Sequence, residues 1–438
     1  MIPYKKKKFA ENKGRGISDM MKNLFFAVSV TLLFTLILPY AVQRKSRAAE
    51  PVCEISRETT GESETTFSAE GEGSVSAIKS DENAVVTRAK ASYLVDYHSG
   101  TVLQAENENK RLPIASMTKL MLLNLCFEKA EKGELSFDEK ITVSVRASGM
   151  GGSQVFLEAG GEYPADDLIK SVIVASANDA SVALAERLYG SEENCVVAMN
   201  EKCREWSLEN TSFRNCTGLP ASEHFSSAKD VSVILTKLLA HKDYFRYSGI
   251  WTDEIRHPKG NVTGLTNTNK LSRFYAGCDG GKTGYTAEAG FCLAATAKRG
   301  NMRAIAVVIG EENSKERFAD VSALFDHAFN CYVNRAVVDS SNPLEYEVKV
   351  SKGKKNVVGT IAETDFYLFG KKGDRDEIRI DFESSGATAP VKKGEKVGKL
   401  VIYKNHVCAG EVNVLAAEDV KAKVFFDYLK DVASGWRI

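Results

Sequence analysis

An uncharged apolar run from Leu24 to Val42 divides the chain into a short basic part and a long remainder. A helix of this length nearly spans the hydrocarbon core of a bilayer. Seven basic side chains precede the run, and a positive flank is typical of the end that stays inside the cell: Lys5, Lys6, Lys7, Lys8, Lys13, Arg15 and Lys22. We therefore expect export of everything downstream and a retained membrane anchor, with a cleaved signal segment as the alternative.

The remainder of the 438 residues is long enough for two or three domains. Residues 50–82 carry nine acidic and two basic side chains among many serines, threonines and glycines. Such a composition cannot bury enough apolar surface to order itself, so it predicts a disordered linker.

Strand and helix patterns alternate after this linker. The stretch 91–104 alternates apolar and polar residues around a His-Ser-Gly turn, which predicts a hairpin. Strands at both ends of a mainly helical middle predict an α/β (α+β) domain with an antiparallel sheet. The helical patterns cover 116–131, 166–188, 229–241 and 315–336, and the further strands cover 291–299 and 303–310.

Beyond about residue 340 the pattern changes to short β segments separated by turn residues, which predicts a small all-β domain. Apolar residues at four-residue steps then predict an amphipathic helix at the end of the chain, which either lies in a membrane interface or packs on the β domain. The expected organisation is a cytoplasmic N-terminus (1–22), an anchor or signal segment (23–42), a linker (43–85), a catalytic domain (86–340), a β-rich domain (341–416) and the helix (417–438).

Charge and cysteine content exclude several classes of function. The chain has 58 basic and 58 acidic side chains, so no basic excess points to a nucleic-acid partner. None of the nine cysteines forms a Cys-x-x-Cys pair, so we expect no metal site, no cofactor and mostly free buried thiols. A disulfide among Cys195, Cys203 and Cys216 remains open at this stage.

The Ser-x-x-Lys pattern occurs four times but joins a strand to an apolar helix at one place alone, Ser116 and Lys119. Residues at i and i+3 share a helix face, so the lysine amine lies beside the serine hydroxyl. A buried lysine next to a hydroxyl indicates a nucleophile with its base. The other three copies are Ser76 with Lys79, Ser226 with Lys229 and Ser351 with Lys354.

Two more motifs follow in order. Ser176 and Asn178 form a Ser-x-Asn pattern after an apolar stretch, and Lys282, Thr283 and Gly284 form the one Lys-Thr-Gly of the chain, directly before a predicted strand. The three motifs together are typical of penicillin-interacting enzymes.

Here the sequence resembles the serine D-alanyl-D-alanine carboxypeptidases, the low-molecular-mass penicillin-binding proteins. The resemblance runs from about residue 88 to 425 and includes the stretches 152–161, 171–186, 215–230, 267–271 and 389–405. It implies a penicillin-binding/β-lactamase-like catalytic domain followed by a β domain. It also implies removal of the terminal D-alanine from peptidoglycan stem pentapeptides through an acyl-serine, covalent inhibition by β-lactams, and a catalytic domain outside the bacterial cell membrane.

The resemblance also implies a role for each motif residue. Ser116 is the expected nucleophile, Lys119 its proton acceptor and Ser176 a proton relay. Asn178 is expected to hold the substrate amide, and Lys282 and Thr283 its terminal carboxylate. The backbone N–H groups of Ser116 and of Tyr285, which follows Gly284, form the expected oxyanion hole. Two positions depart from the family pattern: Tyr285, where other residues are frequent, and Thr268, where some relatives carry an arginine.

Three alternatives fit less well. A class A β-lactamase needs a Glu-x-x-Leu-Asn motif, which residues 205–210 miss by one position. A catalytically silent penicillin-binding wall protein is hard to reconcile with three intact motifs. A catalytic histidine would be His98, His224 or His257, but no motif surrounds any of them.

Overall fold

The computed structural model describes residues 84–435, so the expected cytoplasmic N-terminus, the apolar run and nearly all of the linker lie outside the described residues. Within the described part, no helix combines the length and the apolar character that crossing a membrane requires.

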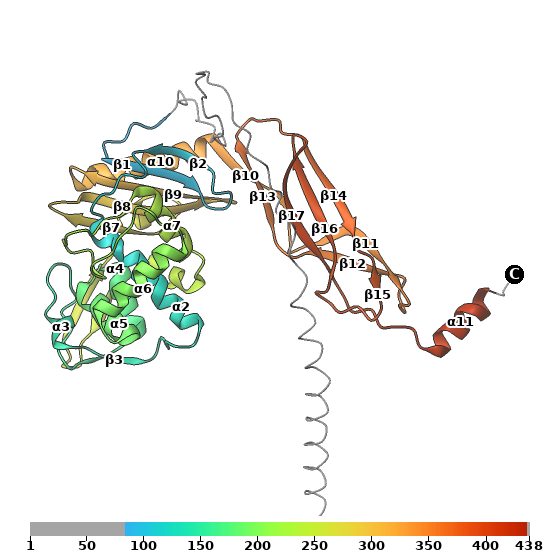
Figure 1. Cartoon of the computed structure of the whole chain (residues 1–438), viewed down its shortest axis with the longest axis horizontal. Coiled ribbons are helices and arrows are strands. Elements are labelled where there is room, and N and C mark those ends of the chain that lie inside the picture. Colours follow the sequence, from blue (N-terminus) through green and yellow to red (C-terminus); the bar gives the residue numbers. More distant parts are fainter. Residues whose placement is uncertain (1–83, 436–438) are drawn as a thin grey trace, which may run out of the picture. The chain divides into compact units, whose positions relative to one another are not determined.

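A five-stranded antiparallel sheet forms the centre of the first folded region (Figure 1). The expected hairpin is confirmed, because its two strands pair through the turn at residues 97–101. In spatial order the strands are β2 (Val102–Glu106), β1 (Ala91–Asp96), β9 (Met302–Glu311), β8 (Gly290–Arg299) and β7 (Cys278–Thr286).

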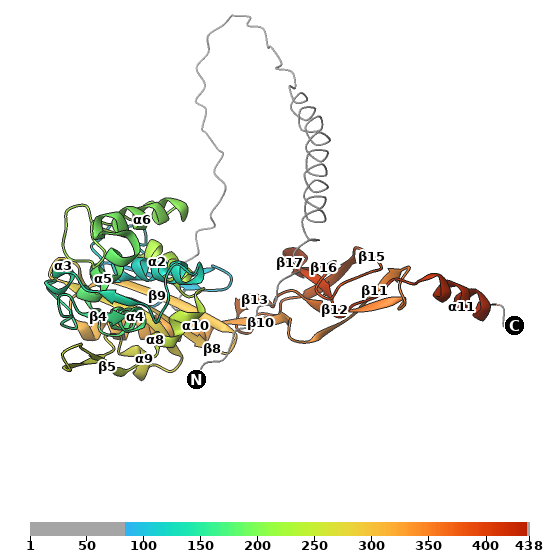
Figure 2. The same cartoon turned by 90° about the horizontal axis from the view of Figure 1, so that it is seen from below.

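Helices cover both faces of this sheet (Figures 1 and 2). Successive strand residues alternate between the faces, so Leu94 and Val308 pack with α10 while Val95 and Val307 pack with the larger helical layer. α10 spans Ser314–Cys331, and the larger layer holds α2 (Lys119–Glu131), α4 (Ala165–Val174), α5 (Asn178–Tyr189), α6 (Glu192–Glu205) and α7 (Ala228–Leu238).

Short elements fill the connections around these helices. They are η1 (Ala115–Thr118), α3 (Val145–Ser148), η2 (Lys242–Tyr244), α8 (Phe245–Ser248) and α9 (Leu271–Phe274), with the two-stranded pairs β3 (Lys140–Thr142) with β4 (Glu162–Pro164) and β5 (Thr252–Arg256) with β6 (Val262–Thr266).

Two expectations about these elements were wrong in detail. The single helix expected over 166–188 is two helices, because Ser176 between them has a φ of +61°, which interrupts the helix. The last helix ends at Cys331 and not at residue 336, since the chain turns there into strand β10. The Lys-Thr-Gly motif lies inside strand β7 itself, and the predicted strand β8 follows after a turn. The sequence did not predict α6.

The second region is all-β, as expected. β10 (Tyr332–Val338) pairs with β13 (Phe366–Lys371), so strand pairing with this region begins before residue 341. A six-stranded sheet packs a core of aliphatic residues such as Val358, Ile402 and Val414. Its order is β14 (Ile378–Ser384), β16 (Lys396–Lys404), β17 (Val407–Ala416), β12 (Val357–Ala362), β11 (Pro343–Ser351) and β15 (Ala387–Thr388).

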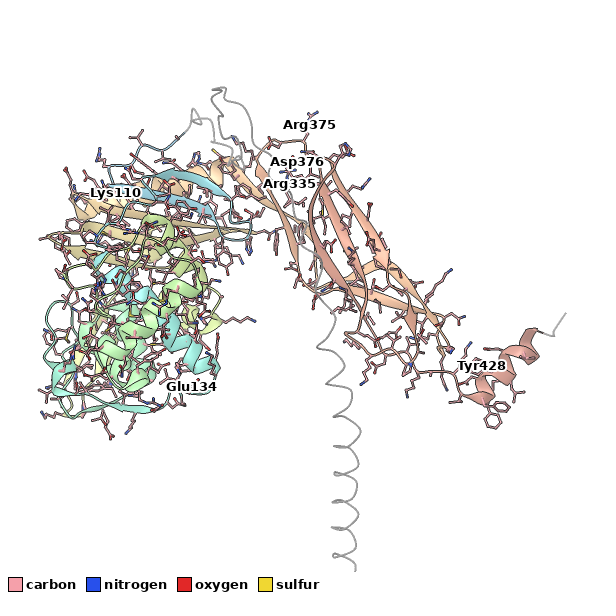
Figure 3. All side chains as sticks on the ribbon, in the orientation of Figure 1. Lys110, Glu134, Arg335, Arg375, Asp376 and Tyr428 are labelled. Atoms are coloured by element: carbon pink, nitrogen blue, oxygen red, sulfur yellow. The ribbon has the colours of Figure 1, made fainter. Side chains whose placement is uncertain are left out.

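The last described helix, α11 (Phe425–Gly435), has the amphipathic pattern expected from the sequence. Val420, before the helix, is buried in the β core. The apolar side chains of the helix are exposed, and Tyr428 among them is labelled in Figure 3. The others are Phe425, Phe426, Leu429 and Val432.

Candidate active site

Ser116 and Lys119 meet at the junction of η1 and α2. Lys119 Nζ lies 2.9 Å from Ser116 Oγ, as the i, i+3 spacing predicts. Lys119 is fully buried, whereas Ser116 is partly exposed. Ala115, immediately before the serine, has a φ of +46°, a conformation that costs free energy for a residue with a Cβ. The nucleophile is thus presented on a strained turn, with its candidate base beneath it.

The surroundings of Lys119 favour its neutral form. Burial lowers the pKa of Lys119 to about 7, although the Coulomb interactions with Cys216 and Asp179 act in the opposite direction. Lys119 Nζ also donates to the carbonyl oxygen of Thr217 at 2.6 Å. With a pKa of about 7, about half of the Lys119 amine is neutral at pH 7, and the neutral form can take the proton of the serine hydroxyl.

A second serine and lysine form the opposite wall. Lys282 Nζ on β7 donates to Ser176 Oγ at 2.8 Å and to the carbonyl oxygen of Thr283 at 3.1 Å. Burial lowers the pKa of Lys282 well below its ordinary value, and the charges of Lys119 and Arg317 lower this pKa further. The two site lysines therefore repel each other when both are charged, and we treat their titration as that of a pair.

Asn178 holds one wall of the site and leaves an acceptor free. Its Nδ2 donates to the carbonyl oxygen of Gly151 at 2.7 Å, and its backbone N–H donates to the carbonyl oxygen of Ser153 at 2.7 Å. Its Oδ1 is buried, and within the described part of the chain it has no hydrogen-bond partner. A buried acceptor without a partner is costly, so this oxygen is suited to the N–H of a ligand.

Of the two positions expected to depart from the family pattern, Tyr285 lies on β7 and Thr268 contacts that strand. Thr283 Oγ1 donates to Thr268 Oγ1 at 2.8 Å. The Tyr285 ring is exposed and stacks on Phe291 with ring centroids 4.2 Å apart. These side chains shape the edge of the site next to the lysine of the third motif.

Two glycines clamp the strained turn of the nucleophile. A Cβ on Gly218, whose φ is +84°, would lie 1.9 Å from the carbonyl oxygen of Ala115. A Cβ on Gly284 would lie 2.6 Å from the carbonyl oxygen of Ile114. No side chain fits at either place. Gly284 was predicted through its motif, whereas Gly218 and the Thr217 carbonyl were missed, because backbone groups in a loop leave no residue-type signal.

The histidines and cysteines have other environments. His224 Nε2 lies 2.8 Å from Thr118 Oγ1 behind the nucleophile turn, and burial lowers its pKa to about 4. His257 contacts Tyr163 and Thr263. The eight cysteines of the described part are free, which excludes a disulfide among Cys195, Cys203 and Cys216 in this structure. Residues 84–435 contain no cluster of His, Cys, Asp and Glu side chains that could hold a metal ion.

A helix-covered antiparallel sheet that carries a Ser-Lys pair, a second serine and a lysine on its edge strand defines a serine hydrolase of the penicillin-binding class. Comparison with known proteins identifies the family. Residues 78–313 match the family model described as D-alanyl-D-alanine carboxypeptidase, and residues 333–422 match the model of the penicillin-binding protein 5 C-terminal domain. The chain belongs to the D-alanyl-D-alanine carboxypeptidase family.

Individual relatives agree with this assignment. The D-alanyl-D-alanine carboxypeptidase DacF of Bacillus subtilis is 41% identical over 350 residues, which cover 80% of this chain and 90% of the relative. DacA of Haemophilus influenzae is 30% identical and covers 78% of this chain and 88% of its own length. Among solved structures, penicillin-binding protein 5 from Haemophilus influenzae matches with a TM-score of 0.61 at 29% identity, covering 77% of this chain and 99% of that one.

Proposed function

We propose that the chain is a serine D-Ala-D-Ala carboxypeptidase that removes the terminal D-alanine from peptidoglycan stem pentapeptides. The observation that carries this proposal is the approach of Lys119 Nζ to Ser116 Oγ within a buried site that lowers the pKa of the lysine. Binding of β-lactams at the same serine follows from the same chemistry.

In the proposed reaction, Ser116 Oγ attacks the carbonyl carbon of the penultimate D-alanine while its proton passes to Lys119. The N–H groups of Ser116 and Tyr285 stabilise the oxyanion. The C–N bond then breaks, and the departing D-alanine amine takes a proton through Lys119 and Ser176. Water hydrolyses the acyl-serine and regenerates the free hydroxyl.

The same site residues supply substrate binding. Lys282 and Thr283 hold the terminal carboxylate. Its negative charge raises the pKa of the buried Lys282, so this lysine becomes protonated when the substrate binds. Asn178 Oδ1 accepts a substrate N–H, which supplies the missing partner of that oxygen. Residues 341–416 contain none of the motif residues, so we assign them to positioning the enzyme in the cell wall.

We also propose that the catalytic domain acts outside the cytoplasm, attached to the cell membrane. The apolar run at 24–42 and the exposed apolar side chains of α11 support this location. Flotation of the full chain and of Phe425→Ser/Phe426→Ser with phosphatidylglycerol vesicles separates the contribution of α11 from that of the N-terminal run.

Labelling with a fluorescent penicillin, followed by peptide mapping, tests the activity. We expect one adduct, on the peptide that contains Ser116, release of D-alanine from a D-Ala-D-Ala peptide, and loss of both in Ser116→Ala. A long-lived penicilloyl adduct is expected, whereas a β-lactamase would release it rapidly. An adduct on Ser226 or Ser351 would overturn the assignment, and an adduct without D-alanine release would indicate a silent penicillin-binding protein.

A further inference from the structure

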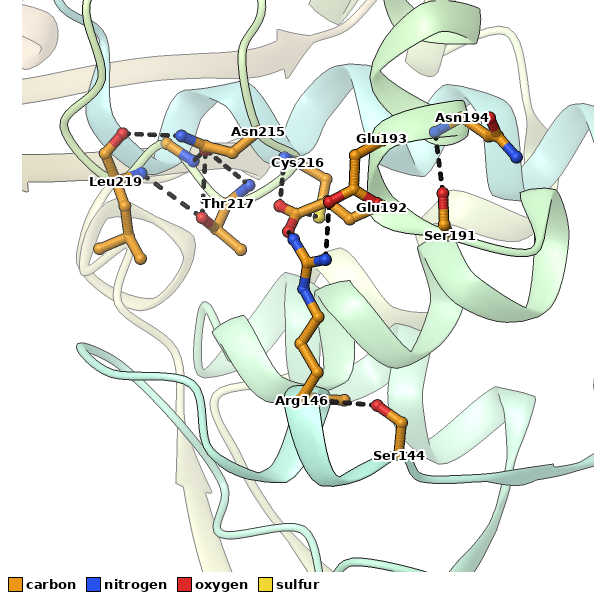
Figure 4. Close-up of polar contacts among 12 residues, drawn as sticks. Ser144, Arg146, Ser191, Glu192, Glu193, Asn194, Asn215, Cys216, Thr217 and Leu219 are labelled. Atoms are coloured by element: carbon orange, nitrogen blue, oxygen red, sulfur yellow. Dashed lines mark hydrogen bonds and ion pairs between the residues drawn. The ribbon is translucent and has the colours of Figure 1, made fainter.

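The loop Asn215–Leu219 provides the carbonyl group that contacts the candidate base, and it is held from inside by Asn215 (Figure 4). Asn215 Oδ1 accepts from the N–H of Thr217 at 3.2 Å and from the N–H of Gly218 at 2.7 Å, while its Nδ2 donates to the carbonyl oxygen of Leu219 at 2.9 Å. These bonds fix the shape of the turn, but they do not fix where the turn lies relative to α2.

A buried carboxylate from α6 anchors the loop from outside. Glu192 Oε1 accepts from the backbone N–H of Cys216 at 3.1 Å, and the thiol of the same cysteine lies 3.4 Å away (Figure 4). Glu192 Oε2 pairs with Arg146 of α3 at 2.7 Å. The Glu192 side chain is 8% exposed. Burying a carboxylate is costly unless it is paired and hydrogen-bonded, and here both partners are present.

Glu193, the next residue, can be compared with Glu192 in its contact with the loop. It binds the same Arg146 at 2.6 Å, but its side chain is 65% exposed. In the part of the chain that the structure describes, no hydrogen bond joins it to the Asn215–Leu219 loop. The two adjacent glutamates therefore share one ion-pair partner and differ in their contact with the loop.

The loop position matters because of the geometry of a neutral amine. Such an amine has one lone pair and two N–H bonds, so the lone pair faces the serine proton only when the N–H bonds are directed elsewhere. The Thr217 carbonyl, 2.6 Å from Lys119 Nζ, receives one of them. A displaced carbonyl would leave the amine free to rotate away from Ser116.

We propose that Glu192 is a positioning residue for the acylation step: by holding the Cys216 N–H it places the Thr217 carbonyl, which orients Lys119 toward Ser116. This inference rests on the proposed function of Ser116 and Lys119. It names a residue outside the three motifs, on a helix that contains none of them, and it links α3 and α6 to the base.

The test measures the second-order rate of acylation by benzylpenicillin against pH. It compares the wild-type full chain with the variants Glu192→Ala, Glu192→Gln and Glu193→Gln. We expect Glu192→Ala to lose about tenfold in plateau rate, or about 1.4 kcal/mol of barrier. Its ascending limb moves to lower pH, because a carbonyl acceptor favours the charged amine. Glu192→Gln keeps an acceptor for the Cys216 N–H, so we expect it to recover to within about threefold of wild type.

Glu193→Gln is the matched control and is expected to stay within twofold of wild type. If Glu192→Ala folds and its acylation rate has the same plateau and the same ascending limb against pH as wild type, the positioning role is overturned. The function of Ser116 is then unaffected. If Glu192→Ala does not fold, Glu192→Gln decides: a tenfold loss there shows that the charge, and not the hydrogen bond to the loop, is what matters, and also overturns the inference. Failure of the wild type to acylate at Ser116 would instead refute the proposed function.

Discussion

The two folded regions of this chain bury different kinds of side chain. The first buries charged groups, among them Lys119, Asp179 and Lys282. In the second, among the described residues after 340, Thr360 is the one buried polar side chain, and its hydroxyl donates to the carbonyl oxygen of Tyr346. In the second region the ion pair of Lys399 with Glu411 lies at the surface, and Asp376, whose side chain is 10% exposed, pairs with the partly exposed Lys404.

Buried backbone strain follows the same division, whereas exposed residues with positive φ occur in both regions. In the first region, non-glycine residues with positive φ include Ala115 and Ser176, which are buried and belong to the site. In the second region such residues are Lys352, Asn405 and His406, which are exposed and lie in turns. Buried charges and a strained backbone both lower the stability of a fold. They are therefore found together where function requires them. The comparison therefore locates the chemistry in the first region.

The largest effect is expected when the candidate base, Lys119, is replaced. Arginine keeps a positive charge but does not deprotonate in the working pH range, so we expect Lys119→Arg to lower the acylation rate by about 10²–10⁴. Lys129→Arg on the same helix, at a partly exposed position paired with Glu134, is the control and keeps the wild-type rate. Stopped-flow acylation with benzylpenicillin measures both. A near wild-type rate in Lys119→Arg would mean that the lysine acts as an electrostatic anchor only.

A pair of glycines tests the clamp around the nucleophile. Gly218 and Gly190 have similar φ values, +84° and +80°, but a Cβ on Gly218 meets the carbonyl of Ala115 whereas a Cβ on Gly190 meets nothing within 4 Å. We expect Gly190→Ala to lower the unfolding free energy by about 1 kcal/mol and to leave the acylation rate unchanged. Gly218→Ala is expected to cost more stability and to slow acylation by about 100-fold. Equal rates for the two variants would show that the turn does not need the clamp.

The smallest effect is expected from the buried hydroxyl of the second region. Thr360→Val removes its bond to Tyr346 without changing its shape, at a cost of about 1 kcal/mol in the unfolding free energy. Acylation is expected to stay within twofold of wild type, with calorimetry reporting the stability. A tenfold slower acylation in the folded variant would show that the β-rich region shapes the site.

The sequence predicted the side chains of the site and two backbone N–H groups, and it missed the loop carbonyl group that contacts the base. The i, i+3 spacing placed Lys119 beside Ser116 correctly, because a helix fixes that relation locally. The Thr217 carbonyl comes from a loop about 100 residues away from Lys119, and Glu192, which anchors that loop, is about 70 residues away from the same lysine. Their approach depends on packing that periodicity does not encode.

Errors in the fold have related causes. The helical pattern over 166–188 continues through Ser176, because apolar spacing does not reveal that this single residue adopts the left-handed conformation. The strands over 291–299 and 303–310 were predicted correctly, and both faces of β8 and β9 are buried because one face packs on α10 and the other on the larger helical layer. Elements with a strong local pattern were thus found, and those set by distant contacts were not.

The pH dependence of wild-type acylation tests the central claim most directly. If buried Lys119 is the base, with a pKa of about 7, the neutral fraction rises through neutral pH, and the second-order rate with benzylpenicillin rises with it. We expect an ascending limb near pH 7, shared with the coupled Lys282, and an adduct on Ser116 at every pH. A rate that stays flat from pH 5.5 to 9, or one that rises only near pH 10 as for an exposed lysine, would contradict the account.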